Sequence, residues 1–297
     1  MRKDLLSVSD LNSEEIRSLI ADAIDLKAQG WLSSLSQKVL AIMFEKPSLR
    51  TRVSFEVAMR QLGGQTVYLS PTEVGLGQRE SVPDVARVLS RYVDVIATRA
   101  FSHRTLEVLA AYSGVPVINA LSDEEHPCQA LADLLTIYEK KRELRGLTLA
   151  YIGDGNNVAN SLMLAASLVG MNFRIASPAG YSVNEDLFNQ SQDYAAIHGT
   201  ELVYTDVWTS MGQEAEVEER RRVFAGYQVN SRLLSLAREG AIFMHPLPAH
   251  HGEEVADGIL DSPASVVFDQ AENRMHLQKA LLKQMLGGLE IPLAGYR

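Results

Sequence analysis

Short apolar runs alternate with helix-like segments along almost the whole chain, and this alternation restricts the fold more than any other feature. Each run has the length of a strand, and most are followed by apolar residues at helical spacing. Such alternation predicts an α/β fold, with parallel strands and helices on both faces of each sheet. The runs expected to be strands are 38–45, 65–70, 93–99, 115–121, 147–152, 171–178, 200–206, 240–248 and 263–272.

The 297 residues are enough for two domains of ordinary size. A charged segment, "EKKRELRG", marks a boundary near residue 140. We therefore expect two doubly wound domains, 1–140 and 141–275, with an active-site cleft between their facing strand ends. The segment 182–199 is expected to be a helix of the second domain. A closing helix at 276–297 is expected to pack back on the first domain.

Composition excludes several classes of function. The formal net charge of −9 argues against a nucleic-acid surface, so an anionic substrate would need a local basic cluster. One cysteine, Cys128, allows neither an intramolecular disulfide nor a cysteine-based zinc cluster. No apolar run is long enough for a membrane span, and no secretory signal pattern is visible at the N-terminus. We expect a cytoplasmic enzyme that binds neither membrane nor nucleic acid.

The segment "SLRTR" supplies that basic cluster. Ser48–Arg52 follows a predicted strand and opens a predicted helix, whose free backbone N–H groups and dipole attract anions. Arg50 and Arg52 add guanidinium groups that suit phosphate oxygens, and Arg99 follows another predicted strand. A plain helix cap with two solvated arginines, and a surface ion pair for Arg99, are the alternatives.

A second set of polar residues lies at other predicted strand and helix ends. His126 and Gln129 of "HPCQ" share one face of a helix start and can donate to one small polar group, although His126 could instead be satisfied by backbone. "GDGNNVAN" does not fit a dinucleotide site, because Val158 occupies the third glycine position and the next strand ends without an acidic residue. Its two asparagines suit a carboxylate or a zwitterion instead.

"DVWTSMGQE" places Asp206 after a predicted strand, where it could pair with an ammonium group. The following run "QEAEVEERRR" is expected to be a solvated helix. "HPLPAHH" contains three histidines, and a metal-dependent hydrolase using His245, His250 and His251 is one alternative. No other ligand-rich segment completes such a site, so we expect no metal; the roles of His250 and His251 stay open.

Together these segments resemble the aspartate/ornithine carbamoyltransferase family, most closely its ornithine branch, over essentially the whole chain and in the same order. "FEKPSLRTRVSFE" is similar to the carbamoyl-phosphate loop of that family, and "HPCQALADLLT" to its carbamoyl-binding helix start. "GDGNNVANSLM", "DVWTSMGQE", "HPLPAH" and "FDQAENRMH" are similar to its ornithine-side motifs. The resemblance implies transfer of a carbamoyl group from carbamoyl phosphate to L-ornithine in arginine biosynthesis, without metal or cofactor. It also implies a homotrimer, or a larger assembly of trimers, in which a loop near Gln78–Ser81 reaches a neighbouring site.

The resemblance also implies a role for each site residue. The phosphate is expected to be held by Ser48, Leu49 (through its backbone N–H), Arg50, Thr51 and Arg99. The carbamoyl carbonyl is expected to be polarised by Thr51, Arg99 and His126, and the carbamoyl NH₂ to be accepted by Gln129 and the backbone at Pro246 and Leu247. Ornithine is expected to be bound by Asn157, Asp206, Ser210 and Met211. Arg274 is expected to bind carbamoyl phosphate and to approach the same centre. The residues expected to act in catalysis are Thr51, Arg99, His126, Asp206 and Arg274.

Three departures from the family pattern accompany this resemblance. Leu49 replaces a threonine in the phosphate loop, Pro246 stands where the ornithine branch carries cysteine, and Gly75 replaces a side chain of the inter-subunit loop. Aspartate and putrescine are alternative acceptors, and a non-catalytic member that binds a ligand or a partner is the rival from another class. Asp206 favours ornithine, because it would repel aspartate.

Overall fold

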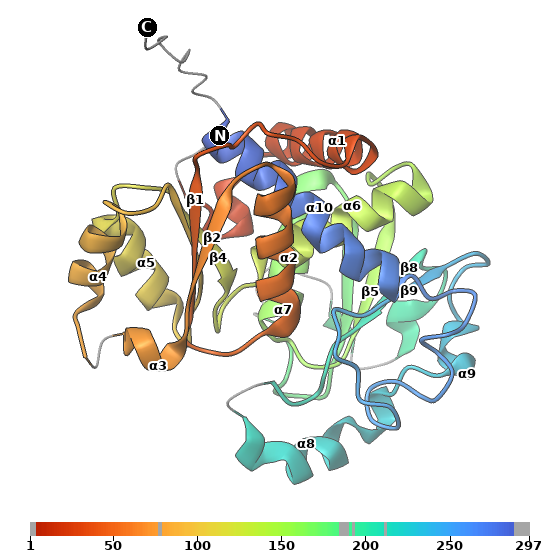
Figure 1. Ribbon diagram of the computed structural model, residues 1–297. Helices are drawn as coiled ribbons and strands as arrows, with labels where there is room; N and C mark the ends of the chain where they lie inside the picture. Colours follow the sequence, from red (N-terminus) through yellow and green to blue (C-terminus); the bar gives the residue numbers. More distant parts are fainter. Residues whose placement is uncertain (1–3, 77–78, 184–189, 192–193, 211–212, 288–297) are drawn as a thin grey trace, which may run out of the picture. The chain divides into compact units, whose positions relative to one another are not determined.

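The computed structural model describes residues 4–76, 79–183, 190–191, 194–210 and 213–287 (Figure 1). Contacts between residues divide the chain into two compact units. The first contains Met1–Asp123 and Met275–Arg297, and the second contains Glu124–Arg274. Among the described residues, no helix combines the length and the apolarity that crossing a membrane requires.

The first unit is built on a four-stranded parallel sheet. Its strands are β1 (Val39–Phe44), β2 (Gln65–Leu69), β3 (Val95–Arg99) and β4 (Val117–Leu121), in the order β2-β1-β3-β4. The chain order therefore reverses between β1 and β3. In open parallel sheets the crevice at the carboxyl ends of two such strands is the preferred ligand position.

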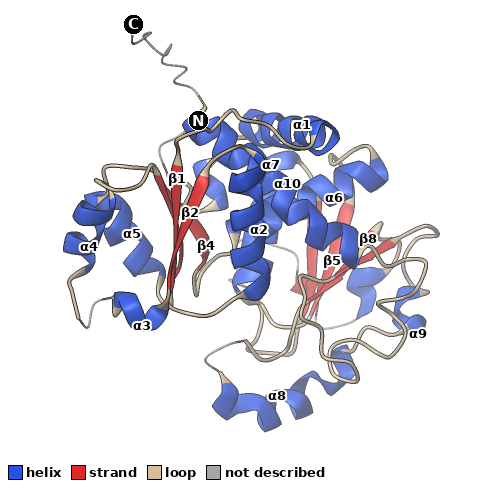
Figure 2. Cartoon of the chain, in the orientation of Figure 1, coloured by secondary structure: helices blue, strands red, loops and turns tan. Residues whose placement is uncertain are grey.

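Helices cover both faces of this sheet (Figure 2). Helix α2 (Leu49–Gln61) lies on one face, and α4 (Val82–Leu89) and α5 (His103–Tyr112) lie on the other, next to the short α3 (Pro71–Val74). Helix α1 (Ser13–Gln29) begins with a capping box in which Asn12 and Glu15 bond reciprocally to backbone N–H groups, as its sequence predicts. Apolar residues of the sheet and of α4 and α5, among them Met43, Ile96 and Val85, form a buried cluster.

The second unit repeats this plan. Its strands are β5 (Thr148–Ile152), β6 (Asn172–Ala176), β7 (Gln190–Ser191), β8 (Leu202–Thr205) and β9 (Ile242–Met244), all parallel and in the order β7-β6-β5-β8-β9. Here the chain order reverses between β5 and β8. The helices of this unit are α6 (Pro127–Lys141), α7 (Asn157–Val169), α8 (Val217–Phe224) and α9 (Ser231–Leu234). Two doubly wound parallel α/β units are thus confirmed.

The last described helix, α10 (Val267–Leu286), begins in the second unit and ends in the first. Within the first unit its buried Lys279 donates to the Leu26 and Gly30 carbonyls at the end of α1 and to Gln61. A cation at these last carbonyls stabilises a helix C-terminus. The expected packing of the closing helix on the first unit is therefore confirmed for the described residues.

Two expectations about elements were wrong. The segment 263–272 is not a strand: Ser265 makes one isolated bridge to Phe243, and α10 starts at Val267. The segment 182–199 was expected to be a helix, but its described part contains β7 and a 3₁₀ turn at Tyr194–Ile197. Pairing with the edge of β6 and burial of Ile197 under the sheet outweigh the helical spacing there.

Candidate active site

The first group of site residues surrounds the N-terminus of α2, directly after β1. Ser48 is the N-cap: its Oγ accepts from the Thr51 backbone N–H at 3.4 Å and donates to Thr51 Oγ1 at 3.0 Å. Thr51 is buried and Arg50 is partly buried, which lowers the Arg50 pKa through desolvation. This helix start combines two hydroxyls, free backbone N–H groups and a guanidinium, which suits a phosphate.

Arg99 lies at the same edge of the same sheet. It is the buried last residue of β3 and pairs in register with Phe44, the last residue of β1. The Glu45 N–H donates to the Arg99 carbonyl at 2.8 Å, so the two strand ends stay joined one residue further. Arg99 and the loop that leads from β1 to α2 therefore both lie at the carboxyl ends of β1 and β3, where the strand order reverses.

Arg52 does not belong to this group, contrary to the sequence analysis. Its Nε donates to Glu56 Oε1 at 2.8 Å, and its guanidinium lies over the Tyr68 ring at 3.8 Å. One turn of helix separates Arg52 from Glu56, and that spacing favours an ion pair on the helix surface. Leu49 is 77% exposed at the first position of α2, so its side chain makes little contact with the unit around it.

The loop expected to reach a neighbouring subunit lies between α3 and α4. Gly75 has φ +52°, a conformation that favours glycine, and the Ser81 side chain caps α4. Gln78 lies outside the described residues. The proposed role of this loop therefore stays a prediction.

In the second unit the start of α6 carries His126 and Gln129, both buried. The His126 N–H donates to Ser161 Oγ at 2.8 Å, which attaches this helix start to α7. Gln129 Nε2 donates to Asp133 Oδ1 at 2.8 Å. Cys128, between them, is fully buried, and burial raises the pKa of its thiol to about 12. Cys128 is therefore a protonated apolar packing residue at neutral pH.

The "GDGNN" turn connects β5 to α7. A Cβ on Gly155 would lie 2.3 Å from the Val183 nitrogen, so close packing of two backbone segments explains this glycine without a dinucleotide. Asn156 is the N-cap of α7, and its Oδ1 accepts from the Val158 and Ala159 N–H groups. Asn157, the residue selected from the sequence, is the first residue of the helix itself.

Asn156 has a second contact that the sequence analysis missed: its Nδ2 donates to Asp206 Oδ2 at 2.8 Å. Asp206 follows β8, so this bond crosses the point where the strand order of the second sheet reverses. Burial raises the pKa of Asp206, opposed by the hydrogen bonds from Asn156 and the Val207 N–H. The preference for asparagine at the N-cap, one residue before the helix, is the sequence signal that could have identified Asn156.

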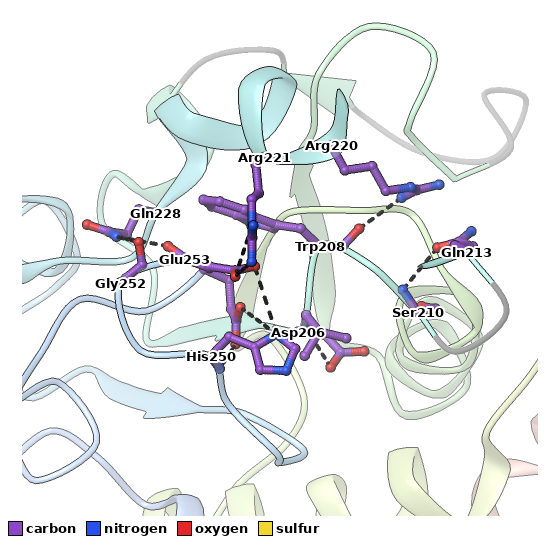
Figure 3. Close-up of polar contacts among 12 residues, drawn as sticks. Asp206, Trp208, Ser210, Gln213, Arg220, Arg221, Gln228, His250, Gly252 and Glu253 are labelled. Carbon is purple, nitrogen blue, oxygen red and sulfur yellow. Dashed lines mark hydrogen bonds and ion pairs between the residues drawn. The ribbon is translucent and has the colours of Figure 1, made fainter. Parts of the chain in front are cut away.

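Ser210 lies beyond Asp206 in the same loop, and its N–H donates to Gln213 Oε1 at 3.0 Å (Figure 3). Met211 lies outside the described residues. The helix after this loop, α8, was expected to be solvated, and on one face it is not. Arg220 is buried and donates to Asp154 Oδ2 at 2.8 Å and to the Trp208 carbonyl at 2.9 Å, so it supports the loop from beneath.

The turn "HPLP" follows β9 and is held by a buried pair. Leu247 N–H donates to His245 Nδ1 at 2.9 Å, so that nitrogen carries no proton and Nε2 is the N–H donor of the ring. His245 Nε2 lies 3.1 Å from Glu254 Oε1, which also accepts from the His250 N–H at 2.6 Å. Leu247 has φ +54°, and the Leu247–Pro248 bond is cis. Buried Pro246 and this pair fix the backbone that was expected to accept the carbamoyl NH₂.

His250, Glu253 and Glu254 bring three possible metal ligands within 4.8 Å of one another. The Arg221 guanidinium donates to Glu253 Oε1 at 2.8 and 3.1 Å, as Figure 3 shows. Because this ion pair already neutralises Glu253, we interpret the cluster as stabilising the loop after "HPLP" and not as a metal site.

Arg274 is the last residue of the second unit, buried in α10. Its charge acts on Asp133 and on Cys128, both in α6. Of the expected residues, the first unit thus holds Ser48, Leu49, Arg50, Thr51 and Arg99. The second unit holds His126, Gln129, Asn157, Asp206, Ser210, Pro246, Leu247 and Arg274.

Both parts of the chain match known protein families. Residues 3–139 match "Aspartate/ornithine carbamoyltransferase, carbamoyl-P binding domain", and residues 145–285 match "Aspartate/ornithine carbamoyltransferase, Asp/Orn binding domain".

Similar proteins match over nearly their whole length. An ornithine carbamoyltransferase of Anoxybacillus flavithermus is 51% identical over 303 residues, covering 96% of each chain. An anabolic ornithine carbamoyltransferase of Pyrococcus furiosus is 48% identical over 307 residues, covering 97% of this chain and 98% of that protein. Among solved structures, the ornithine carbamoyltransferase of Thermus thermophilus has a TM-score of 0.91 at 48% identity, covering 96% of this chain and 99% of that chain.

Proposed function

This chain belongs to the aspartate/ornithine carbamoyltransferase family, and we propose that it is an ornithine carbamoyltransferase. The reaction moves the carbamoyl group of carbamoyl phosphate to the δ-amine of L-ornithine and releases citrulline and phosphate. The near-full-length identity to proteins of that name supports this assignment.

Asp206 is the observation that carries the choice of acceptor. Its buried carboxylate has a raised pKa, so an ammonium beside it would offset the cost of burying the charge. The α-ammonium of ornithine supplies that cation, whereas the second carboxylate of aspartate would be repelled. Ser210 and Met211 are proposed to complete the amino-acid site, with the Asn157 side chain and the α7 N-terminus facing the α-carboxylate.

The chemistry needs a free amine, a polarised carbonyl and a stabilised leaving group. Ser48, Arg50, Thr51, Arg99 and the Leu49 N–H are proposed to bind the phosphate and stabilise its charge as it leaves. Arg99, Thr51 and His126 are proposed to polarise the carbonyl oxygen. Gln129 and the backbone at Pro246 and Leu247 are proposed to accept the carbamoyl NH₂, with Arg274 close to the same group.

The δ-amine of ornithine is lysine-like, with a pKa of about 10.4, and must lose a proton before it attacks. The rate of the chemical step should therefore rise as the pH increases from 7 to 9. We propose that these steps need neither a metal nor a cofactor.

We further propose that residues 1–140, with 276–297, act as the carbamoyl-phosphate domain and 141–275 as the ornithine domain. A cytoplasmic homotrimer, or a larger assembly of trimers, working in arginine biosynthesis is proposed from the family resemblance. The anabolic name of the Pyrococcus furiosus relative supports that direction.

A colorimetric assay for ureido products tests the proposal, with ornithine, aspartate and putrescine supplied separately with carbamoyl phosphate. Citrulline from ornithine, with at most traces from the other two acceptors, is the expected result. A larger product yield from aspartate or putrescine would assign a different acceptor. No product from any of the three would favour a non-catalytic family member.

A further inference from the structure

A buried carboxylate, Asp133, lies one helical turn after Gln129 and accepts three hydrogen bonds. Gln129 Nε2 and Gln270 Nε2 both donate to its Oδ1 at 2.8 Å, and the Tyr204 hydroxyl donates to its Oδ2 at 2.9 Å. These donors come from α6, α10 and β8, all within the second unit. Nothing in the expected mechanism uses Asp133, although it is completely buried.

The first consequence concerns the orientation of the Gln129 amide. An amide can turn by half a rotation and exchange its oxygen and nitrogen. An ionised carboxylate accepts hydrogen bonds only, so Asp133 selects the orientation in which the Gln129 nitrogen faces it. Gln129 Oε1 then points the other way, and among the described residues this buried oxygen has no hydrogen-bond partner. A buried acceptor without a donor costs about 1–3 kcal/mol, which a ligand N–H would recover.

Gln270 is oriented in the same manner. Its Nε2 also donates to the Tyr204 hydroxyl at 3.1 Å, and its Oε1 accepts from the His245 N–H at 2.9 Å. His245 leads directly into Pro246 and Leu247. Gln270 therefore links the Asp133 carboxylate to the backbone that enters the "HPLP" turn by hydrogen bonds at both ends of its amide.

We propose that Asp133 is a positioning residue for the carbamoyl group. Its carboxylate fixes two glutamine amides, so that Gln129 presents its oxygen to the carbamoyl NH₂ and the backbone entering the "HPLP" turn is held through Gln270. This inference rests on the proposed function, because it assigns Asp133 a role in the same reaction.

Asp133 stays ionised at the pH of the proposed reaction although it is buried. Burial raises the pKa of Asp133 to about 6, while the bonds from Gln129, Gln270 and Tyr204 and the positive charge of Arg274 act in the opposite direction. The group is therefore mainly ionised above neutral pH, where the amine of the acceptor reacts.

The variant Asp133→Asn tests the proposal. Its amide presents an N–H either to the glutamines or to Tyr204, so it cannot accept all three bonds. We expect the KM for carbamoyl phosphate to rise about tenfold, equivalent to the loss of one neutral hydrogen bond between the Gln129 oxygen and the carbamoyl NH₂. Inorganic phosphate, which has no NH₂ group, should inhibit the variant and the wild type with inhibition constants within about twofold of each other, because a lost hydrogen bond affects only the ligand that makes it.

Thr136→Val is the matched control. Thr136 is buried one turn further along α6, donates to the Ala132 carbonyl and accepts from Asn273, so its loss also weakens the packing of this helix. This control should leave the KM for carbamoyl phosphate unchanged even if the melting temperature falls. Gln129→Ala should reproduce the pattern of Asp133→Asn, and the double variant should be little worse than either.

Several outcomes would overturn the inference. If Asp133→Asn weakens the binding of carbamoyl phosphate and of phosphate by the same factor, Asp133 only stabilises the fold around the site. Additive effects in the double variant would lead to the same conclusion. An unchanged KM for carbamoyl phosphate would do the same. If Asp133→Asn does not fold, Asp133→Glu displaces the same charge by one methylene and should raise that KM while sparing phosphate inhibition.

Failure of the proposed function would be distinguishable from failure of the inference. If the wild type forms no citrulline, calorimetric titration with carbamoyl phosphate and with phosphate, without ornithine, makes the same comparison of variants. Selective weakening of carbamoyl phosphate binding by Asp133→Asn would still support the inference, and equal binding would overturn it.

Discussion

The Asn156 side-chain nitrogen donates to the Asp206 carboxylate at 2.8 Å and thereby joins the loop after β5 to the end of β8. These two strands flank the point where the order of the second sheet reverses. The same asparagine caps α7 through its oxygen, so one side chain fixes both the helix start and the acid. The position of Asp206 thus depends on a residue that belongs to a different strand–helix turn.

Asn156→Asp should separate the two duties of this side chain. Aspartate caps a helix as well as asparagine does, but it places a like charge against Asp206. We expect the KM for ornithine to rise by at least about tenfold, while the KM for carbamoyl phosphate changes little. Steady-state kinetics with each substrate varied in turn measure both.

Asn156→Ser is the companion variant, since serine retains the cap and removes the amide donor. Its KM for ornithine should rise less than that of Asn156→Asp. Equal KM values for ornithine in wild type and both variants would show that Asp206 is positioned without Asn156.

Cys128 should resist thiol reagents in the native protein. Burial raises the pKa of its thiol to about 12, so the thiolate is scarce at pH 8. The same burial keeps the reagent away from the sulfur. With Ellman's reagent we expect no colour within minutes from the native protein and one equivalent after unfolding in urea, because the chain has one cysteine. One equivalent from the native protein, with loss of activity, would contradict the packing of α6.

The elements that frame the site were predictable from the sequence because each depends on local pattern. The strands ending at Phe44 and Arg99 are short buried apolar runs, and the α2 start carries a serine cap that bonds within three residues. Parallel pairing then brings these ends to one edge of the sheet. Periodicity and capping are sufficient for such features.

The remaining details depend on partners far along the chain, which local pattern does not contain. Asn156 was overlooked in favour of Asn157 because its partner Asp206 is fifty residues away. Arg220 was expected to be solvated because its ion-pair partner, Asp154, lies far from it in the sequence. The prediction of a strand at 263–272 was wrong because this segment makes one isolated bridge to β9 and α10 begins at Val267.

The charge on Asp133 should lower folding stability at neutral pH. Because its pKa is raised in the folded state, the native protein binds the proton more tightly than the unfolded chain does. Stability relative to Asp133→Asn is therefore highest below about pH 4 and falls as the pH rises through about 6.

The full change in the free energy of unfolding is about 3 kcal/mol, which urea titrations of both proteins between pH 4 and pH 7.5 should measure. A difference between the two proteins that does not vary with pH would show that Asp133 has the same pKa folded and unfolded.

Leu49→Thr should strengthen phosphate binding. Leu49 is exposed at the first turn of α2, so threonine would add a hydroxyl donor beside the proposed phosphate site without disturbing the core. The KM for carbamoyl phosphate and the inhibition constant of phosphate should both fall by about three- to tenfold. Leu49→Ala removes the same apolar group without adding a donor and should leave both constants near the wild-type values; a matching fall in the alanine variant would assign the effect to loss of the leucine.

Simultaneous measurement of citrulline and phosphate from purified protein, carbamoyl phosphate and L-ornithine tests the central claim most directly. We predict that the two products form in equal amounts, that their initial rate rises as the pH increases from 7 to 9, and that Asp206→Asn reduces that rate by raising the KM for ornithine. Phosphate release without citrulline, or citrulline formation that is indifferent to Asp206→Asn, would contradict the assignment of Asp206 to the ornithine site.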